Sequence, residues 1–113
     1  MTTSQKPSIT IYKANANPIA LSEICAGLEE EGVLYEVVNI SYSDVKTLAY
    51  NAANHSKLRV GIGITNESAA LQLKNLPIDK PIFTIELGTH QAYPCCRKLG
   101  TNAARAIKGN KLV

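Results

Sequence analysis

The run Leu58–Ile64 constrains the possible folds more than any other part of this sequence. Its residues are LRVGIGI, and after Arg59 they are apolar on both alternations. A strand with one face in water would alternate apolar and polar residues, so the run predicts a central strand that is covered on both faces. Apolar runs and helical patterns alternate along the rest of the chain, which favours a layered α/β fold.

The other expected elements follow from apolar periodicity and from turn residues. Further strands are predicted at 9–12, 34–40 and 82–87, and helices are predicted from Pro18 to Gly32, from Ser43 or Asp44 onward, at 67–74 and at 93–108. Residues 1–7 are expected to form a flexible N-terminal tail because they are mostly polar. Residues 8–113 are expected to form a single α/β domain, which suits a chain of this length.

Two glycines of the central run, Gly61 and Gly63, begin like the phosphate-binding loop of a dinucleotide site. The third glycine of that motif is absent, and the spacing places both residues inside the strand rather than after it. Glycine within a strand often allows another backbone to approach closely, and we favour that interpretation. No nucleotide is therefore expected to bind this chain.

No set of reactive side chains predicts an active site. His55 and His90 have no motif partner and are interpreted as surface residues, and no Gly-x-Ser-x-Gly nucleophile elbow is present. Cys25, Cys95 and Cys96 match neither a zinc knuckle nor an even disulfide framework, so we expect structural roles for them in a reducing cytosol. We predict no catalytic and no cofactor-binding residues, and an enzyme is the least favoured class.

The sequence also predicts a cytoplasmic location. No basic start followed by an apolar stretch indicates a secretory signal. No apolar run approaches the ~20 residues that a membrane-spanning helix needs. We therefore expect a soluble protein with no membrane partner.

The charges are distributed unevenly. Residues 1–40 carry two Lys and five Glu, whereas residues 87–113 carry two Arg, three Lys and no acidic residue. A basic segment can bind nucleic acid, but these cations are dispersed and no row of aromatic residues lies among them to stack on bases. A solvated helix face is the favoured interpretation, and a docking surface for an acidic protein partner is the second.

The acidic triplet Glu29-Glu30-Glu31 lies in the last turn of the first predicted helix. Exposed acidic groups at that end of a helix typically cost about 0.3–1 kcal/mol each, because the helix dipole is negative there. A step of ~100° per residue directs Glu30 away from the apolar face of the helix, with Glu29 and Glu31 at its borders. The triplet is either a solvated charge run or a carboxylate offered to a basic partner or to a hard cation such as Mg²⁺ or Ca²⁺.

Several segments together resemble the small subunit of the diol and glycerol dehydratase reactivases. They are Gly27–Val33 (GLEEEGV), Val60–Gly63 (VGIG), Lys74–Pro77 (KNLP) with Pro81–Thr84 (PIFT), and Gly100–Gly109 (GTNAARAIKG). They occur in the order found in that family, and the last of them is the most specific. The resemblance covers residues 8–109.

The resemblance implies a three-layer α/β/α fold with a mixed, mostly parallel sheet of about five strands, similar to the dehydratase medium subunit and to anticodon-binding-like domains. It also implies a non-catalytic subunit of an ATP-dependent, chaperone-like reactivase that releases damaged cobalamin from a B12-dependent diol or glycerol dehydratase. The ATPase activity would belong to the large subunit. The small subunit would leave it, and the dehydratase would dock in its place by subunit exchange. A bacterial microcompartment is implied as an alternative to the open cytoplasm.

The resemblance further assigns a role to Glu30. In this family the small subunit contributes a glutamate to a divalent cation, Mg²⁺ or Ca²⁺, at the interface with the large subunit. Glu30 is the matching position, and the helical geometry selects the same residue. The segment Gly88–Cys96 departs from the family pattern because it is poorer in His. The alternatives to a reactivase subunit are a structural subunit of the dehydratase itself and a stand-alone α/β module that binds a ligand or RNA.

Overall fold

Two β–α units open the chain, and three consecutive strands and a long helix follow. The computed structural model describes residues 6–89 and 91–113, so residues 1–5 of the tail predicted at 1–7 and the placement of His90 lie outside the described residues. The elements are β1 (Ile9–Lys13), α1 (Pro18–Glu30), β2 (Tyr35–Asn39), α2 (Val45–His55), β3 (Val60–Ile64), β4 (Ser68–Leu73), β5 (Phe83–Glu86) and α3 (Ala92–Lys108). None of the helices in the described ranges combines the length and apolar character that a membrane crossing requires.

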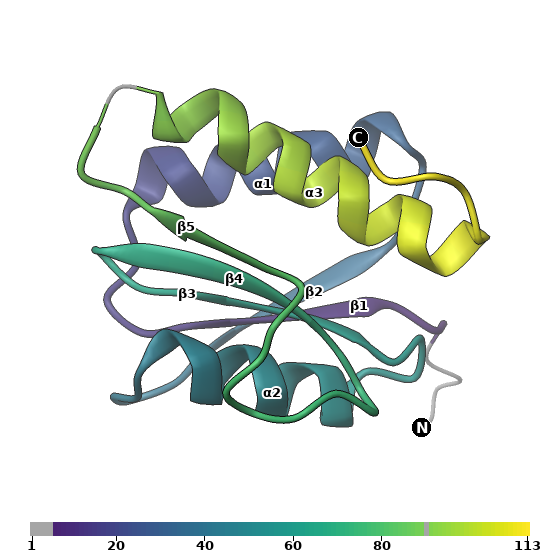
Figure 1. Ribbon diagram of the computed structural model, residues 1–113, viewed down its shortest axis with the longest axis horizontal. Coiled ribbons are helices and arrows are strands. Elements are labelled where there is room, and N and C mark those ends of the chain that lie inside the picture. The colour runs from purple at the N-terminus through teal and green to yellow at the C-terminus, as the bar shows by residue number, and fades with distance from the viewer. Residues whose placement is uncertain (1–5, 90) are drawn as a thin grey trace.

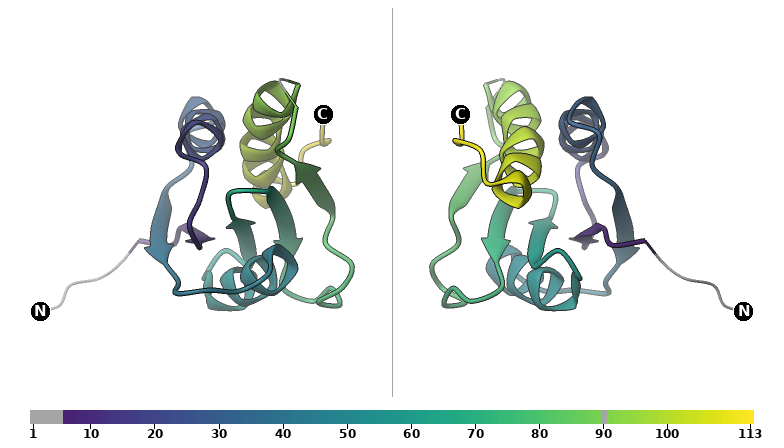
Figure 2. Two further views of the ribbon diagram at one scale, coloured as in Figure 1. Left: turned by 90° about the vertical axis from the view of Figure 1, so that its left-hand side faces the viewer. Right: turned by 90° about the vertical axis from the view of Figure 1, so that its right-hand side faces the viewer.

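The strands form one sheet in the order β2-β1-β3-β4-β5. β1 pairs in parallel with β2 and β3, whereas β4 is antiparallel to both β3 and β5. All strands except β4 therefore share one direction. Helices α1 and α3 lie side by side over one face of the sheet, and α2 covers the other (Figures 1 and 2). This confirms the predicted α/β/α fold with a mixed, mostly parallel sheet.

The central strand is β3, as the run Leu58–Ile64 predicts, and all of its residues are buried. A Cβ atom added to Gly61 would lie 2.5 Å from the carbonyl carbon of Ala52, and one added to Gly63 would lie 2.5 Å from the amide nitrogen of Ala49. Neither distance is sterically possible, so α2 can pack on β3 only where these side chains are missing. The two glycines therefore allow the close approach of a helix, as predicted.

The prediction of a short helix at 67–74 is wrong, because these residues form β4. Ala, Leu and Gln favour helices, and they dominate this segment. The structure instead pairs β4 with β3 on one side and β5 on the other, and it buries residues 69–72 completely. Burial between two strands and two layers of helices outweighs the small intrinsic preference for a helix.

Helices α1 and α3 make a close contact through two glycines. A Cβ atom on Gly100 would collide with the carbonyl oxygen of Ile24, and one on Gly27 would lie 2.9 Å from the amide nitrogen of Thr101 and collide with the carbonyl oxygen of Arg97. Gly100 costs helix stability by itself, and in exchange it permits this contact. Because the two helices run in the same direction, the contact also brings the C-terminal turn of α1 beside α3.

The helix ends agree with the caps that the sequence suggests. Asn17 Oδ1 accepts hydrogen bonds from the backbone N–H groups of Ile19 at 3.0 Å and Ala20 at 3.1 Å, and Pro18 occupies the first helical position. Asp44 caps α2, and Gly109 ends α3 with a φ of 72°. These groups satisfy backbone donors and acceptors that the helix itself leaves unpaired.

Candidate functional site

The acidic triplet lies at the C-terminal end of α1, as predicted. The helix ends at Glu30, Glu31 is its cap residue, and Gly32 follows with a φ of 73°. The amide of Gly32 donates to the carbonyl oxygen of Glu29, and the amide of Val33 donates to that of Leu28. These hydrogen bonds end the helix directly after the triplet, so the three glutamates lie together at its C-terminal end.

Each glutamate of the triplet has its own partner. The hydroxyl of Tyr35 donates to Glu29 Oε2 at 2.5 Å, and Lys108 Nζ lies 3.3 Å from Glu31 Oε1. The same ammonium donates to the backbone carbonyl oxygen of Glu31 at 2.7 Å. Glu30 pairs with Arg97, and its side chain is 60% exposed against 24% for that of Glu31. Glu30 is therefore accessible from outside, as the helical geometry suggests, but it is not a free carboxylate.

Arg97 from α3 holds two carboxylates of α1. Its Nε atom lies 3.0 Å from Glu23 Oε1, and its Nη1 atom lies 2.9 Å from Glu30 Oε2. The guanidinium carries its donors in a rigid fork and always keeps its charge, so it can serve both carboxylates at once. Sequence reasoning missed Arg97, because no local pattern connects residues so far apart in the chain. We call Glu23, Glu30 and Arg97 the guanidinium bridge.

The neighbouring contact between Tyr35 and Glu29 has a clear electrostatic effect. The hydrogen bond to the Glu29 carboxylate raises the pKa of Tyr35 far above its usual value, and partial burial adds to this increase. The phenol therefore stays protonated and donates this hydrogen bond at any physiological pH. Glu29 is therefore engaged by a phenol and Glu30 by a guanidinium, and both residues are exposed.

The site by itself is incomplete as a metal centre. In the described ranges, no group of three or more His, Cys, Asp or Glu side chains is placed to hold a metal ion. Mg²⁺ and Ca²⁺ take six or more oxygen ligands, and Glu30 would supply one or two of them. The remaining ligands would have to come from water and from another chain.

A hollow of about 410 Å³ opens where β1 and β3 end. This edge is where open α/β sheets usually bind ligands, because the chain connections on either side of it diverge. Here its charged lining residues are Asp44 and Glu67, and no Lys or Arg lines it. Asp44 also occupies the N-terminus of α2, where a phosphate would otherwise bind. The composition of this hollow is therefore unfavourable for an anion.

Comparison with known sequences matches the chain to a dehydratase subunit family and to small subunits of dehydratase-reactivating factors. The dehydratase medium subunit family matches residues 6–113. The chain is 37% identical over 103 residues to the propanediol dehydratase-reactivating factor small subunit of Salmonella typhimurium, a match that covers 91% of this chain and 87% of that one. It is 38% identical over 103 residues to the diol dehydratase-reactivating factor small subunit of Klebsiella michiganensis, covering 91% and 81% of the two chains.

The fold gives the same result. A solved structure of a diol dehydratase-reactivating factor complexed with ADP and Mg²⁺ contains a chain that matches this one with a TM-score of 0.88 and 32% sequence identity. The match covers 96% of this chain and 99% of the other. The chain therefore belongs to the dehydratase medium subunit family and, within it, to the small subunits of the diol and propanediol dehydratase-reactivating factors.

Proposed function

We propose that this chain is the non-catalytic small subunit of an ATP-dependent reactivating factor, and that it works by occupying and then vacating an interface. The ATPase activity belongs to a large subunit, its partner. When the small subunit leaves, the large subunit binds a B12-dependent diol or glycerol dehydratase in its place, and damaged cobalamin is released. The complex acts in the cytoplasm or within a bacterial microcompartment.

The observation that carries this proposal is the family to which the chain belongs. The family model is that of a dehydratase medium subunit, and the chain is also similar over most of its length to small subunits of reactivating factors. Two chains that share a fold can present similar surfaces to one partner. Exchange of one for the other on the large subunit is therefore a physically simple way to reach the dehydratase.

We further propose that Glu30 supplies a ligand to a divalent cation, Mg²⁺ or Ca²⁺, at the interface with the large subunit. Three features support this role: Glu30 is exposed, it lies at a helix end where the dipole attracts cations, and its only described counterion is a surface arginine. A related factor was solved as a complex with ADP and Mg²⁺. We assign the nucleotide to the large subunit, because this chain offers no phosphate-binding loop.

The test is a co-expression pull-down of this chain with the large subunit encoded in the same genome, with and without a chelator. A stable complex that loosens on chelation is expected. Glu30→Ala should weaken the complex far more than Glu29→Ala, which removes the same charge one residue away. Equal and small effects would reject the ligand role of Glu30, and absence of any complex would favour a structural subunit of the dehydratase or a stand-alone module.

Calorimetry on the free chain tests whether ATP binds to the large subunit and not to this chain. The small subunit alone is expected to bind no ATP, and the large subunit is expected to bind it. Micromolar binding of ATP by the small subunit would overturn the assignment of the nucleotide to its partner.

A further inference from the structure

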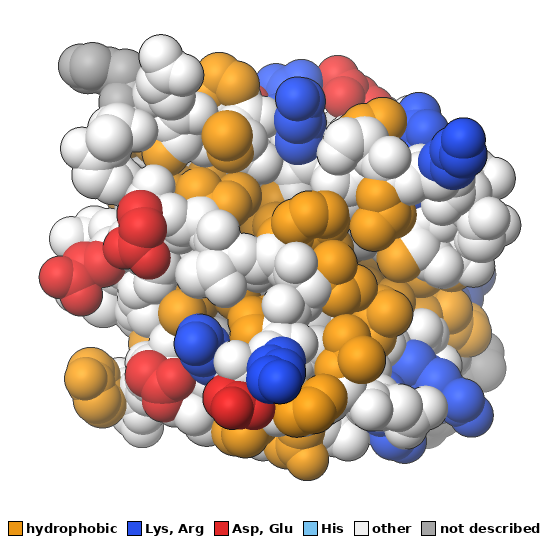
Figure 3. Space-filling model, in the orientation of Figure 1, with side chains coloured by type: hydrophobic (Ala, Val, Ile, Leu, Met, Phe, Trp, Pro, Cys, Tyr) orange, Lys and Arg blue, Asp and Glu red, His pale blue; other side chains and the backbone are white. Residues whose placement is uncertain are grey.

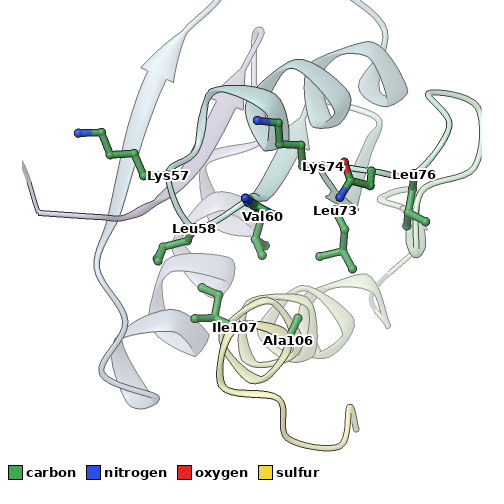
Figure 4. A pocket seen from close by; sticks show the side chains of 10 residues that line it. Lys57, Leu58, Val60, Leu73, Lys74, Leu76, Ala106 and Ile107 are labelled. Atoms are coloured by element: carbon green, nitrogen blue, oxygen red, sulfur yellow. The ribbon is translucent and has the colours of Figure 1, made fainter.

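A hollow of about 460 Å³ lies at the end of the sheet where β3 begins and β4 ends, under the last turn of α3. Its floor is apolar. Figure 4 shows apolar side chains from β3, β4, α3 and the loop before β3 gathered around one space, with Leu76 at its edge. The apolar lining residues are Leu58, Val60, Leu73, Leu76 and Ile107.

The rim of this hollow carries only positive charge. Lys57, Arg59 and Lys74 line it, and no acidic residue does. The two lysine side chains extend outward from the floor in Figure 4, and Figure 3 shows Lys and Arg side chains gathered at the right-hand end of the molecule, where the apolar surface reaches them. Within residues 6–89 and 91–113, none of the three cations lies within 4.0 Å of a carboxylate. We call this surface the basic hollow.

Arg59 occupies an unfavourable backbone conformation, with a φ of 64°. Its amide donates to the carbonyl oxygen of Ser56 at 3.0 Å, and its own carbonyl accepts from the amide of Lys74 at 3.0 Å. Ser56 Oγ also accepts from the amide of Leu58 at 3.1 Å, so the described contacts of this turn use the backbone of Arg59 and not its guanidinium. Glycine would adopt this conformation without steric cost. An arginine in its place indicates that the guanidinium itself has a use, since strained residues often occur at functional positions.

The basic hollow and the acidic turn of α1 are connected through the end of α3. Ile107 forms part of the floor, and the next residue, Lys108, donates to the carbonyl oxygen of Glu31. A partner that engages Glu30 therefore has the basic hollow within reach on the same side of the molecule. The two surfaces carry opposite charges, which would fix the orientation of such a partner.

We propose that the basic hollow docks an acidic segment of the large subunit, with an apolar side chain on the floor and carboxylates beside Lys57, Arg59 and Lys74. This assignment rests on the proposed function for the identity of the partner. An apolar centre within a polar rim is the usual anatomy of a protein interface. A small anion such as phosphate suits the site less well, because the cations lie on the rim and a bound anion would sit on an apolar floor.

The first test compares two variants that change the net charge equally. The hollow variant carries Lys57→Glu, Arg59→Glu and Lys74→Glu. The control variant carries Lys13→Glu, Lys46→Glu and Lys98→Glu. Lys13 ends β1 and Lys46 lies in the first turn of α2, at the opposite end of the strands, whereas Lys98 lies near the middle of α3; none of the three lines the hollow. We expect the hollow variant to bind the large subunit at least about tenfold more weakly than the wild type, and the control to lose less than about threefold, since close charge pairs contribute more than distant ones.

A single substitution tests whether weaker binding by the hollow variant could result from misfolding. Arg59→Gly removes the guanidinium and relieves the backbone, so its thermal midpoint should equal or exceed that of the wild type while binding weakens. Its complex should also remain sensitive to chelation, which separates the basic hollow from Glu30.

The remaining outcomes overturn the proposal. Wild-type binding by both the hollow variant and Arg59→Gly would show that the basic hollow has no part in the interface. Equal losses in the hollow and control variants would show an effect of net charge alone. Tight binding of inorganic phosphate, seen as chemical-shift changes confined to the hollow, would identify a small-anion site. If the wild type itself does not bind the large subunit, the proposed function fails and the partner assignment fails with it.

Discussion

Arg97 Nη1 on α3 lies 2.9 Å from Glu30 Oε2 on α1, so an internal cation already occupies the carboxylate that we assign to an external ion. The pair is partly exposed, with 39% of the Arg97 side chain and 60% of the Glu30 side chain accessible. A surface ion pair of this kind contributes little to stability. The contact can therefore be exchanged for another one without a large loss of fold stability.

Arg97→Met should separate the contribution of Arg97 to fold stability from its effect on cation binding at Glu30. Urea unfolding should show a loss of less than about 1 kcal/mol, because water screens the pairs with Glu23 and Glu30. Association with the large subunit should need less Mg²⁺ for half-maximal complex formation, because the guanidinium no longer competes for Glu30. A higher Mg²⁺ requirement would instead show that Arg97 positions Glu30 for the ion.

In Gly100→Ala, helix propensity and packing have opposite effects on the free energy of unfolding. Propensity alone predicts a gain of about 1 kcal/mol, because glycine is the weaker helix former. The added Cβ would collide with the carbonyl oxygen of Ile24 and lie 3.2 Å from the amide nitrogen of Leu28, both backbone atoms that cannot rotate away. Overpacking of this kind costs about 1–3 kcal/mol or more, so we expect a net loss in the free energy of unfolding.

A matched control for this variant is available in the same protein. Gly88→Ala adds a methyl group where, apart from the two chain neighbours, no atom of the described residues lies within 4 Å, and the φ of Gly88 is not in the left-handed region. It should change the free energy of unfolding little in a urea titration. If Gly100→Ala proves as stable as the wild type, the close contact between α1 and α3 is wrong.

Local signals predicted much of this fold. A continuous apolar run identified β3 as the buried central strand, and the glycines within it predicted the close approach of α2. The pair Ser43 and Asp44 predicted the start of α2, and Asp44 is its cap, because a cap is a contact between neighbours in the sequence. Such features depend on a few adjacent residues, so a single sequence contains them.

The errors and omissions involve contacts between distant parts of the chain. The segment 67–74 has the composition of a helix and becomes β4 only because β3 and β5 lie on its two sides. The helical spacing predicts the exposure of Glu30, but its partner Arg97 comes from another helix. Tertiary packing determines both the strand conformation of this segment and the pairing of Glu30 with Arg97. Local periodicity in the sequence does not indicate such packing.

Asp44 should make the stability of α2 depend on pH. Its carboxylate accepts from the Thr47 hydroxyl at 2.6 Å and from the Thr47 amide at 3.2 Å, and these bonds, the hydroxyl first, lower the pKa of Asp44. A pKa that is lower in the folded state adds stability above the unfolded value of about 3.9, and this stability is lost as the pH falls through the folded value. Asp44→Ala should cost about 0.5–2 kcal/mol at neutral pH.

Asp44→Asn is the control, because it keeps an acceptor without the charge. The wild type should be more stable than Asp44→Asn at neutral pH, and the difference should disappear in acid. The free energy of unfolding, measured in urea across this pH range, gives the comparison. A difference that stays constant with pH would mean that the charge of Asp44 does not contribute to the cap.

Adjacent cysteines in α3 should differ sharply in reactivity. Cys95 is exposed, whereas Cys96 is fully buried, because neighbouring helical residues point about 100° apart. Burial, with a smaller effect from the charges of Cys95 and Glu23, raises the pKa of Cys96 to about 11. The thiolate is the reactive form, so alkylation of Cys96 should stay slow at mildly alkaline pH and speed up as the pH approaches that value.

Mass spectrometry after timed treatment with iodoacetamide can follow each thiol. In the native protein we expect Cys95 to be modified first. Cys25 should also lag, because partial burial raises its pKa. In denaturant all three should react at similar rates, and Cys95→Ser should remove the fast phase while leaving the other two unchanged. Equal rates for Cys95 and Cys96 in the native protein would show that α3 does not bury this face against the sheet, and the contact that places Arg97 beside Glu30 would then be in error as well.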